Sequence, residues 1–338
     1  MLKIRYIIVT NLLFVGLLYS SWNGNIKFGH DTNIMKYSNQ ENPVSSNMVK
    51  LSQAYSGKIS NIFPRETKYK LSIKNSIYTL SQKSNYSYAI QLKQPLGNYR
   101  YLSFNYSYID DIYLRKYIDV DQGGVFGYIY AYEEMHCYFD NTKINVNYEF
   151  PIDFPIMAIT VDSDGDLKLI PAVNKKSKIS ISYLYETQFY NKYFTEFDLE
   201  IYGAKIKYSN NMNLFRYSIS LRSINAENIT LNDIMVSTSF ADRGYLENSI
   251  SLSLKYEKSG FLLAFNKRTF SSNIIEDHLH YNRTHIDAQY TLWRSFYLFG
   301  IKNKIFLKNR IRSTSSNYNW VEDLKTFDKY NLEHVIYF

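Results

Sequence analysis

Segments of about ten residues in which apolar and polar side chains alternate recur from Thr67 to the end of the sequence. In the first of them, Tyr69, Leu71, Ile73 and Ile77 share one parity, while lysines and serines take the other. A period of two residues is the signature of a β-strand with one apolar and one polar face. No later stretch shows a convincing period of 3.6 residues, so we expect an all-β protein without helices.

Counting back from Phe338, the alternation predicts about fourteen antiparallel strands, with 12–16 possible. The predicted strands are 67–80, 84–94, 99–109, 112–120, 125–138, 142–150, 178–190, 197–208, 213–224, 246–256, 260–268, 284–293, 297–311 and 329–338. Short connections near 95–98, 122–124, 209–213, 258–260 and 293–296 fall at one end, and long ones at the other. Short turns at one end and long loops at the other are typical of outer-membrane barrels.

Residues 151–177 are too long for a short turn and are interpreted as an insertion or an extra hairpin, closed at Asp162 to Asp166. If that hairpin joined the main sheet, the count would be sixteen. Asp162 to Asp166 also resembles the start of a calcium loop, but the required Gly and Glu are missing at their positions. A hairpin turn is therefore the better interpretation.

The N-terminal region has the order of a secretory signal peptide. Lys3 and Arg5 precede an apolar run from Tyr6 to Leu18, and the small residues Ser20 and Ser21 follow. This order predicts a signal peptide over 1–21, with a retained anchor as the alternative. Residues 22–66 are polar without a sustained period, and we expect a periplasmic arm or a plug there.

A transmembrane up-and-down β-barrel over 67–338 accounts for this pattern better than a soluble sandwich. Closed barrels satisfy every backbone hydrogen bond inside a bilayer, and their strands alternate between a lipid face and a lumen face. The 34 Tyr and 21 Phe suit the aromatic girdles that such barrels carry at the membrane interfaces. A sandwich also predicts alternation, but not long strands together with an export signal.

The last strand resembles the C-terminal strand of bacterial outer-membrane proteins, which end on Phe with apolar residues at alternating positions. The matching residues are Tyr330, Leu332, Ile336 and Phe338, and His334 departs from the pattern. The resemblance implies a multi-pass barrel of the porin-like class in a Gram-negative outer membrane. It also implies recognition of this strand by the barrel-assembly machinery and contact with outer-membrane lipid and lipopolysaccharide.

Basic residues dominate the polar parity of several strands, in a chain with a formal net charge of +8. We expect pore-lining positions at Lys68, Lys70, Lys74, Arg216, Arg222, Lys302, Lys304, Lys308 and Arg310. The first and last strands of a closed barrel are neighbours, so the lysines of 67–80 should lie within a strand or two of those on 297–311. Rings or ladders of Lys and Arg favour anions in pores, although some of these residues could instead reach for the interfaces.

Other chemistry has weaker support. The single cysteine, Cys137, is interpreted as a small apolar strand residue. The stretch with Glu276, Asp277, His278, His280 and His285 could bind a metal, but a solvated polar loop is the simpler interpretation. No nucleophile stands beside a His and an orienting group, so we expect no enzyme, cofactor, metal or nucleic-acid partner.

The sequence thus favours a porin-like channel for small, preferably anionic solutes. A closed barrel acting through its outer loops is one alternative. A transporter of hydrophobic ligands, plugged by 22–66, is another.

Overall fold

The structure is a computed structural model that describes residues 21–38, 43–60, 65–117, 135–152, 155–161, 167–173, 177–191, 194–212, 215–230 and 242–338. The predicted signal peptide lies outside these residues apart from Ser21, which begins the first strand. The signal peptide therefore stays a prediction.

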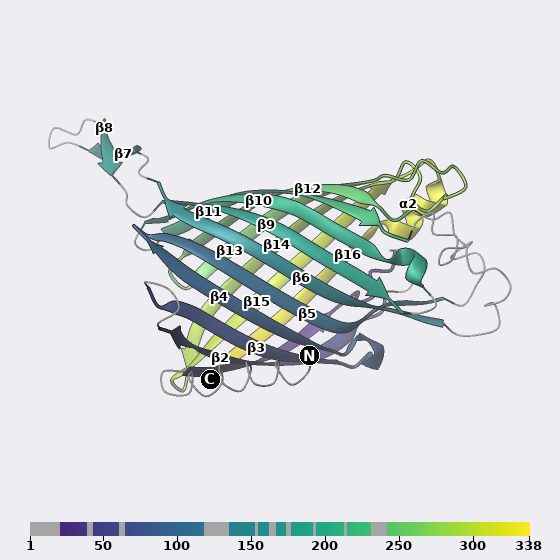
Figure 1. The fold of residues 1–338 in the computed structure, drawn as a ribbon, viewed down its shortest axis with the longest axis horizontal. Helices are drawn as coiled ribbons and strands as arrows, with labels where there is room; N and C mark the ends of the chain where they lie inside the picture. The colour runs from purple at the N-terminus through teal and green to yellow at the C-terminus, as the bar shows by residue number, and fades with distance from the viewer. Residues whose placement is uncertain are drawn as a thin grey trace.

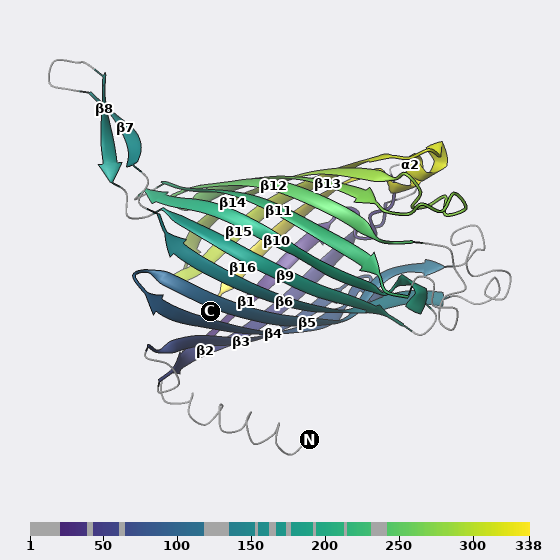
Figure 2. The ribbon, with the colours of Figure 1, turned by 45° about the horizontal axis from the view of Figure 1, so that its top comes forward.

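Fourteen antiparallel strands form one closed barrel (Figures 1 and 2). They are β1 (Ser21–Asp31), β2 (Ser46–Ile59), β3 (Thr67–Tyr78), β4 (Asn85–Gly97), β5 (Arg100–Tyr117), β6 (Met135–Pro151), β9 (Lys178–Tyr190), β10 (Leu199–Met212), β11 (Phe215–Asn228), β12 (Tyr245–Tyr256), β13 (Ser259–Phe270), β14 (Thr284–Leu298), β15 (Ile301–Ser315) and β16 (Phe327–Tyr337). Each strand pairs with the next one along the wall. The predicted barrel class and strand number are confirmed.

The barrel closes where β1 meets β16. Phe338 extends this pairing by one residue: the Gly24 N–H donates to the Phe338 carbonyl at 2.8 Å, and the Phe338 N–H donates to the Gly24 carbonyl at 3.0 Å. The Phe338 ring lies over Gly24, where a Cβ atom would come within 2.2 Å of the ring. The backbone of Phe338 and its side chain therefore both belong to the closing seam.

The expectation of an arm or plug at 22–66 is wrong. β1 and β2 are wall strands, and they lie between β16 and β3. In β2 the exposed Val49 and Leu51 alternate with the lumen-side Lys50, so a period of two is present but short. In β1, two glycines and several polar residues dilute the alternation that would reveal the strand.

The strand number agrees only because two errors cancel: β1 and β2 were missed, while β5 and β6 were each divided into two predicted strands. The predicted strands 99–109 and 112–120 are the single strand β5, and 142–150 continues back to Met135 as β6. Residues 118–134 between them lie outside the described residues. A register shift between Ile109 and Ile112, with Asp111 at φ 47°, interrupts the alternation inside β5. This irregularity looked like a turn in the sequence.

The two ends of the barrel differ in their connections. Two-residue turns at 98–99, 257–258 and 299–300 lie at one end, here called the turn end. The stretches 32–45, 79–84, 118–134, 191–198, 229–244, 271–283 and 316–326 connect strands at the opposite end, here called the outer end. The expected turn near 122–124 lies outside the described residues. The expected turn near 293–296 lies inside β14.

Residues 151–177 hold an extra hairpin, β7 (Pro155–Val161) paired with β8 (Leu167–Val173). It forms a separate two-stranded sheet and stands away from the wall at the turn end (Figures 1 and 2). The sixteen-strand alternative is therefore wrong, while the hairpin itself is present. Asp162 to Asp166 lie outside the described residues.

One short helix departs from the expectation that none is needed: α2 (Asn319–Lys325) lies in the connection between β15 and β16. Among the described residues, no helix has both the length and the apolar character to cross a bilayer.

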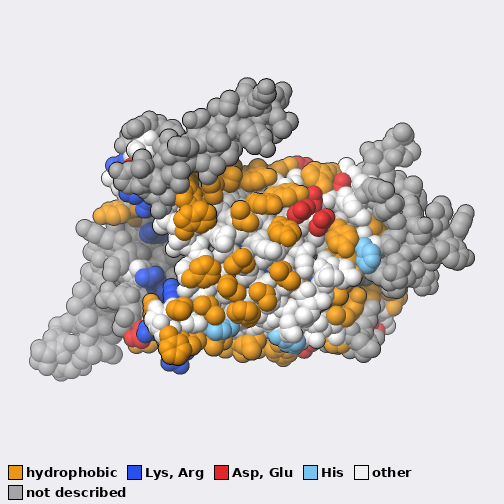
Figure 3. Space-filling model, turned by 90° about the horizontal axis from the view of Figure 1, so that it is seen from below, with side chains coloured by type: hydrophobic (Ala, Val, Ile, Leu, Met, Phe, Trp, Pro, Cys, Tyr) orange, Lys and Arg blue, Asp and Glu red, His pale blue; other side chains and the backbone are white. Residues whose placement is uncertain are grey.

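The wall has an apolar outer face. Large exposed side chains such as Ile73, Ile90, Ile250, Leu292 and Leu332 share the outward parity of their strands. Figure 3 shows hydrophobic side chains spread across the middle of one face, with Lys and Arg at one edge. A closed barrel with such a belt satisfies the backbone inside lipid and leaves no open sheet edge. The protein is a closed, multi-pass β-barrel whose outer face suits a lipid bilayer.

Candidate functional site: a basic lumen

A row of basic residues, here called the ladder, lies along the inner face of β15. Lys302, Lys304, Lys308 and Arg310 share one parity, opposite to the exposed Ile305, Leu307 and Ile311. Arg312 continues the ladder toward the outer end, beyond the predicted end of this strand. The ladder thus extends from near the turn at 299–300 almost to the end of β15.

Buried acids hold the outer part of the ladder. The Arg310 Nη2 donates to the Asp287 Oδ2 at 2.8 Å, and the Arg312 Nε donates to the Asp287 Oδ1 at 2.7 Å. On the neighbouring part of the wall, Glu247 accepts hydrogen bonds from Arg222 at 2.5 Å and from Arg268 at 2.7 Å.

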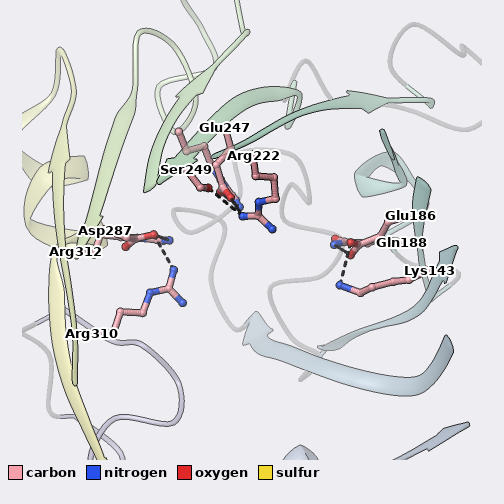
Figure 4. Close-up of polar contacts among 10 residues, drawn as sticks. Lys143, Glu186, Gln188, Arg222, Glu247, Ser249, Asp287, Arg310 and Arg312 are labelled. Carbon is pink, nitrogen blue, oxygen red and sulfur yellow. Dashed lines mark hydrogen bonds and ion pairs between the residues drawn. The ribbon is translucent and has the colours of Figure 1, made fainter. Parts of the chain in front are cut away.

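A third cluster lies on β6 and β9, where Lys143 and Glu186 form an ion pair at 2.9 Å. Figure 4 shows Lys143, Arg222 and Arg310 reaching into the barrel from three separate parts of the wall. The three clusters therefore surround one shared space.

In each cluster the acid is buried and the base projects. The side chain of Asp287 is 4% exposed, compared with 22% for Arg310. Glu247 is 7% exposed, compared with 35% for Arg222, and Glu186 is 9% exposed, compared with 40% for Lys143. The carboxylates thus lie against the wall, and the lumen surface at these clusters is made of cationic groups.

A second basic group lies on β15, β16, β1 and β2. Glu333 binds both Lys27 and Lys308 at 2.8 Å. The Phe306 ring lies 4.4 Å from the Lys304 amine and 5.8 Å from the Lys27 amine. Lys50 lies opposite Lys27 in the pairing of β1 with β2. We call Lys27, Lys50, Lys304 and Lys308 the lysine band.

The prediction that the lysines of β3 lie within a strand or two of the ladder on β15 is wrong. Three strands, β16, β1 and β2, separate them, so Lys74 is not within a strand or two of the ladder. The prediction failed because β1 and β2 were left out of the wall. Lys74 still interacts electrostatically with Lys50 and Lys27, and therefore joins the edge of the lysine band.

The other predicted pore-lining residues are spread along the lumen parity. Lys68 and Lys70 are exposed near the turn end of β3. Arg216 lines a cavity of about 360 Å³ near the turn end of β11, together with Lys178, Lys207 and Trp293. Arg222 lies further along the same strand, in the cluster with Glu247. These positions do not form one compact site.

The predicted assembly residues lie on the outer face of β16. Tyr330 and Leu332 are exposed, as is Phe338 beyond the strand, and Ile336 has the same parity. His334, which departs from the apolar pattern, stacks on Phe296 with an interplanar angle of 12°. Its Nε2 lies 2.9 Å from the Asn303 Oδ1, so a partner on the outer face satisfies its polar atom.

The outer end of the lumen is lined by apolar clusters. Cys137, Tyr190, Phe194 and Phe197 form one buried cluster, which confirms the interpretation of Cys137 as an apolar strand residue. Leu199, Ile201, Ile224, Ala226 and Tyr245 form another.

The interpretation of the histidine stretch as a solvated loop is wrong for three of its members, because Asp277, His280 and His285 are buried. Asp277 accepts hydrogen bonds from the Asp242 N–H at 2.8 Å and the Ser272 hydroxyl at 3.1 Å, and it lies 2.9 Å from the His280 Nδ1. Burial, followed by the charge of Arg283, lowers the pKa of His280 to about 4. The loop is thus anchored by a neutral imidazole and a carboxylate.

Three acids are brought together on β5 and β6 by the irregular register. Asp110, Asp111 and Asp140 offer carboxylate oxygens within 4.8 Å of one another. The Tyr108 hydroxyl donates to Asp140 at 2.7 Å, and the Asp111 N–H donates to the same carboxylate at 3.1 Å. Exposed acidic groups of this kind are common without a metal, so we assign none.

Sequence reasoning missed several lumen cations. Lys27 and Lys50 were overlooked because their strands were not recognised, although the alternation around Lys50 was a usable signal. Arg312 was lost because the predicted strand ended one residue too early. The cations that loops contribute, such as Lys36 and Arg283, carry no periodic signal at all.

No protein-family model and no curated protein matches this chain. Among solved structures, it is similar to OccAB1 of Acinetobacter baumannii, with 7% identity, a TM-score of 0.47 and coverage of 94% of this chain and 96% of that chain. It is also similar to an anion-selective porin from Comamonas acidovorans, with 7% identity, a TM-score of 0.42 and coverage of 94% and 98%. OccAB4 of A. baumannii follows with 6% identity, a TM-score of 0.43 and coverage of 95% and 98%. The likeness concerns barrel architecture alone.

Proposed function

We propose that this protein is a porin-like channel that admits small solutes and favours anions. The observation that carries the proposal is the arrangement of charge in the lumen. At three clusters around the wall, the cation projects and its carboxylate partner is buried against the strands. A permeating ion would therefore meet positive groups first.

The lysine band supports the same preference. One carboxylate, Glu333, serves two of its members, Lys27 and Lys308. At physiological salt the Debye length is about 8 Å, so fields from the wall decay over a distance comparable to a pore radius. Rings of Lys and Arg then raise the local concentration of anions and exclude cations.

The alternative of a transporter plugged by residues 22–66 loses its basis, because β1 and β2 are parts of the wall. A closed barrel that acts through its outer loops remains the second candidate. The long connections at the outer end favour it, and conductance separates it from a channel.

Single-channel recording tests the proposal. Purified protein in planar bilayers should conduct in KCl, and a salt gradient should give a reversal potential on the anion-selective side. A cation-selective reversal potential would contradict the anion preference. A protein that inserts and never conducts would favour the loop-presenting barrel instead.

A further inference from the structure

A cavity of about 400 Å³ lies at the outer end of the lumen, where the inner face of β15 meets the loops. We call it the outer cavity. Its basic lining includes Arg243, Arg268, Arg283, Arg310 and Arg312. Among the described residues that line it, none is Asp or Glu. The volume is within the range of about 300–1,000 Å³ that is usual for small-molecule sites.

Arg283 is a buried cation in the lining of the outer cavity. It is 5% exposed, and its Nε and Nη1 have no hydrogen-bond partner among the described residues. Burial, and then repulsion by Arg243, lowers the pKa of Arg283 well below its usual value. A buried cationic donor without an acceptor is costly unless something supplies one. An anion in the outer cavity would supply it.

The same lining is rich in aromatic rings. The guanidinium of Arg283 lies 3.8 Å from the centre of the Phe270 ring, and that of Arg268 lies 3.7 Å from the centre of the Tyr245 ring. Phe197 and Phe327 add two more rings at the boundary of the cavity. A flat apolar group could therefore stack on rings and guanidinium planes while its charged end meets arginine.

Lys36 adds charge from the first loop. Desolvation by the surrounding protein, followed by the charges of Arg310 and Lys329, lowers the pKa of the Lys36 amine to about 7, although its side chain is exposed to the lumen solvent. An anion in the outer cavity would reduce this repulsion. It would thereby favour the protonated amine, so that binding and the Lys36 charge support each other.

We propose that the outer cavity is a binding subsite for small aromatic carboxylates. The inference rests on the proposed function in one respect, namely that solutes enter the lumen from this end. A bare inorganic anion would leave the apolar lining, including Leu114 and Leu199, without a partner. A neutral hydrophobic molecule would leave the Arg283 donors unsatisfied. A planar carboxylate joined to a ring satisfies both, because guanidinium binds carboxylate through two parallel hydrogen bonds.

Calorimetry on the full-length protein in detergent micelles tests the inference, with benzoate as the probe. Acetate, which lacks the ring, and benzyl alcohol, which lacks the charge, are the matched comparisons. We expect saturable benzoate binding and at least tenfold weaker binding of both comparison molecules. Equal binding of acetate and benzoate would overturn the aromatic part of the inference, and no benzoate binding would overturn all of it.

Arg283→Gln should weaken benzoate binding at least tenfold. Arg294→Gln, which removes the same charge from an exposed position at the turn end of β14, should leave it unchanged. The heat-dependent gel shift of a folded barrel verifies that each variant is folded. Phe270→Leu is a second variant that keeps every charge, and it should weaken benzoate binding while sparing acetate. Full benzoate affinity in both Arg283→Gln and Phe270→Leu would overturn the assignment.

Conductance of the same preparation separates the two claims. A wild type that conducts anions without binding benzoate would disprove only the subsite. A wild type that binds benzoate without conducting would disprove the channel and leave the subsite as part of a binding barrel.

Discussion

The Asp287 carboxylate lies behind the Arg310 guanidinium: the two are joined at 2.8 Å, with the acid 4% exposed and the base 22% exposed. Arg312 binds the other oxygen of the same carboxylate at 2.7 Å. One buried acid thus orients two cations that face the lumen. The acid neutralises part of their charge without itself facing permeating ions.

Replacing Asp287 with Asn should therefore make the channel more anion-selective, because both arginines keep their charge. We expect a larger reversal potential in a KCl gradient and a loss of folding free energy of about 1–3 kcal/mol, since three charge-assisted hydrogen bonds weaken. Glu257→Gln removes the same charge from an exposed turn and is the control. A shift toward cation selectivity in Asp287→Asn would contradict this account.

Phe338→Ala should impair assembly, since the Phe338 ring covers Gly24 at the seam between β1 and β16. Gly24→Val should have a similar effect, because its side chain would collide with that ring. The measurement is the fraction of heat-modifiable, folded protein in outer-membrane fractions. Phe299→Ala, at a turn where the ring is 94% exposed, is the matched control. Wild-type levels of folded Phe338→Ala would refute the role of this ring.

The loop at 271–283 should open more readily as the pH falls. The pKa of His280 is about 4 in the folded loop, compared with 6.5 for a free imidazole. Between these two pH values His280 is protonated in the open loop but not in the folded loop. The contribution of His280 to the stability of the folded loop is therefore complete above pH 6.5 and is lost progressively toward pH 4.

Hydrogen exchange of the loop amides at pH 7 and pH 5, corrected for intrinsic rates, measures this loss. Asp277→Ala should raise exchange at both pH values, because it removes the anchor of the loop. His278→Asn, at an exposed neighbour, should leave the pH dependence unchanged. Exchange that is insensitive to pH in the wild type would exclude His280 as its source.

The two faces of β12 should respond differently to a new charge. Ile250 is 49% exposed on the outward face, whereas Ser253 has the lumen parity. Ile250→Arg should cost about 2–4 kcal/mol if it lies near the bilayer midplane, while Ser253→Arg should be tolerated. Urea unfolding in lipid vesicles compares them. A larger loss of stability for Ser253→Arg would reverse the assignment of faces.

The sequence predicted the barrel because alternation over long strands is a strong signal, as in β3 and β15. It failed at β1, where Gly24 takes an outward position and Gly29 a lumen-side position, for packing reasons that only the folded barrel shows. Gly24 makes room for the Phe338 ring, and Gly29 for the side chain of Met48. It also failed at Asp111, where one left-handed residue shifts the register inside a continuous strand.

The candidate site was only partly predictable. Parity alone placed Lys302 to Arg310 on one face, and the same alternation puts the acids Glu186, Asp287 and Glu333 on lumen parities. It could not show that these acids are buried against the wall, because burial depends on packing between neighbouring strands. The outer cavity was beyond reach, since Lys36 and Arg283 come from loops that only the closed barrel brings together.

The reversal potential of a ladder variant tests the central claim most directly. Replacing Lys302, Lys304, Lys308 and Arg310 by Gln removes four charges and keeps length and polarity. In a KCl gradient the variant should move from anion selectivity toward neutrality and keep most of the wild-type conductance. Unchanged selectivity in a folded, conducting variant would show that the ladder does not face the ion path, and would contradict the account.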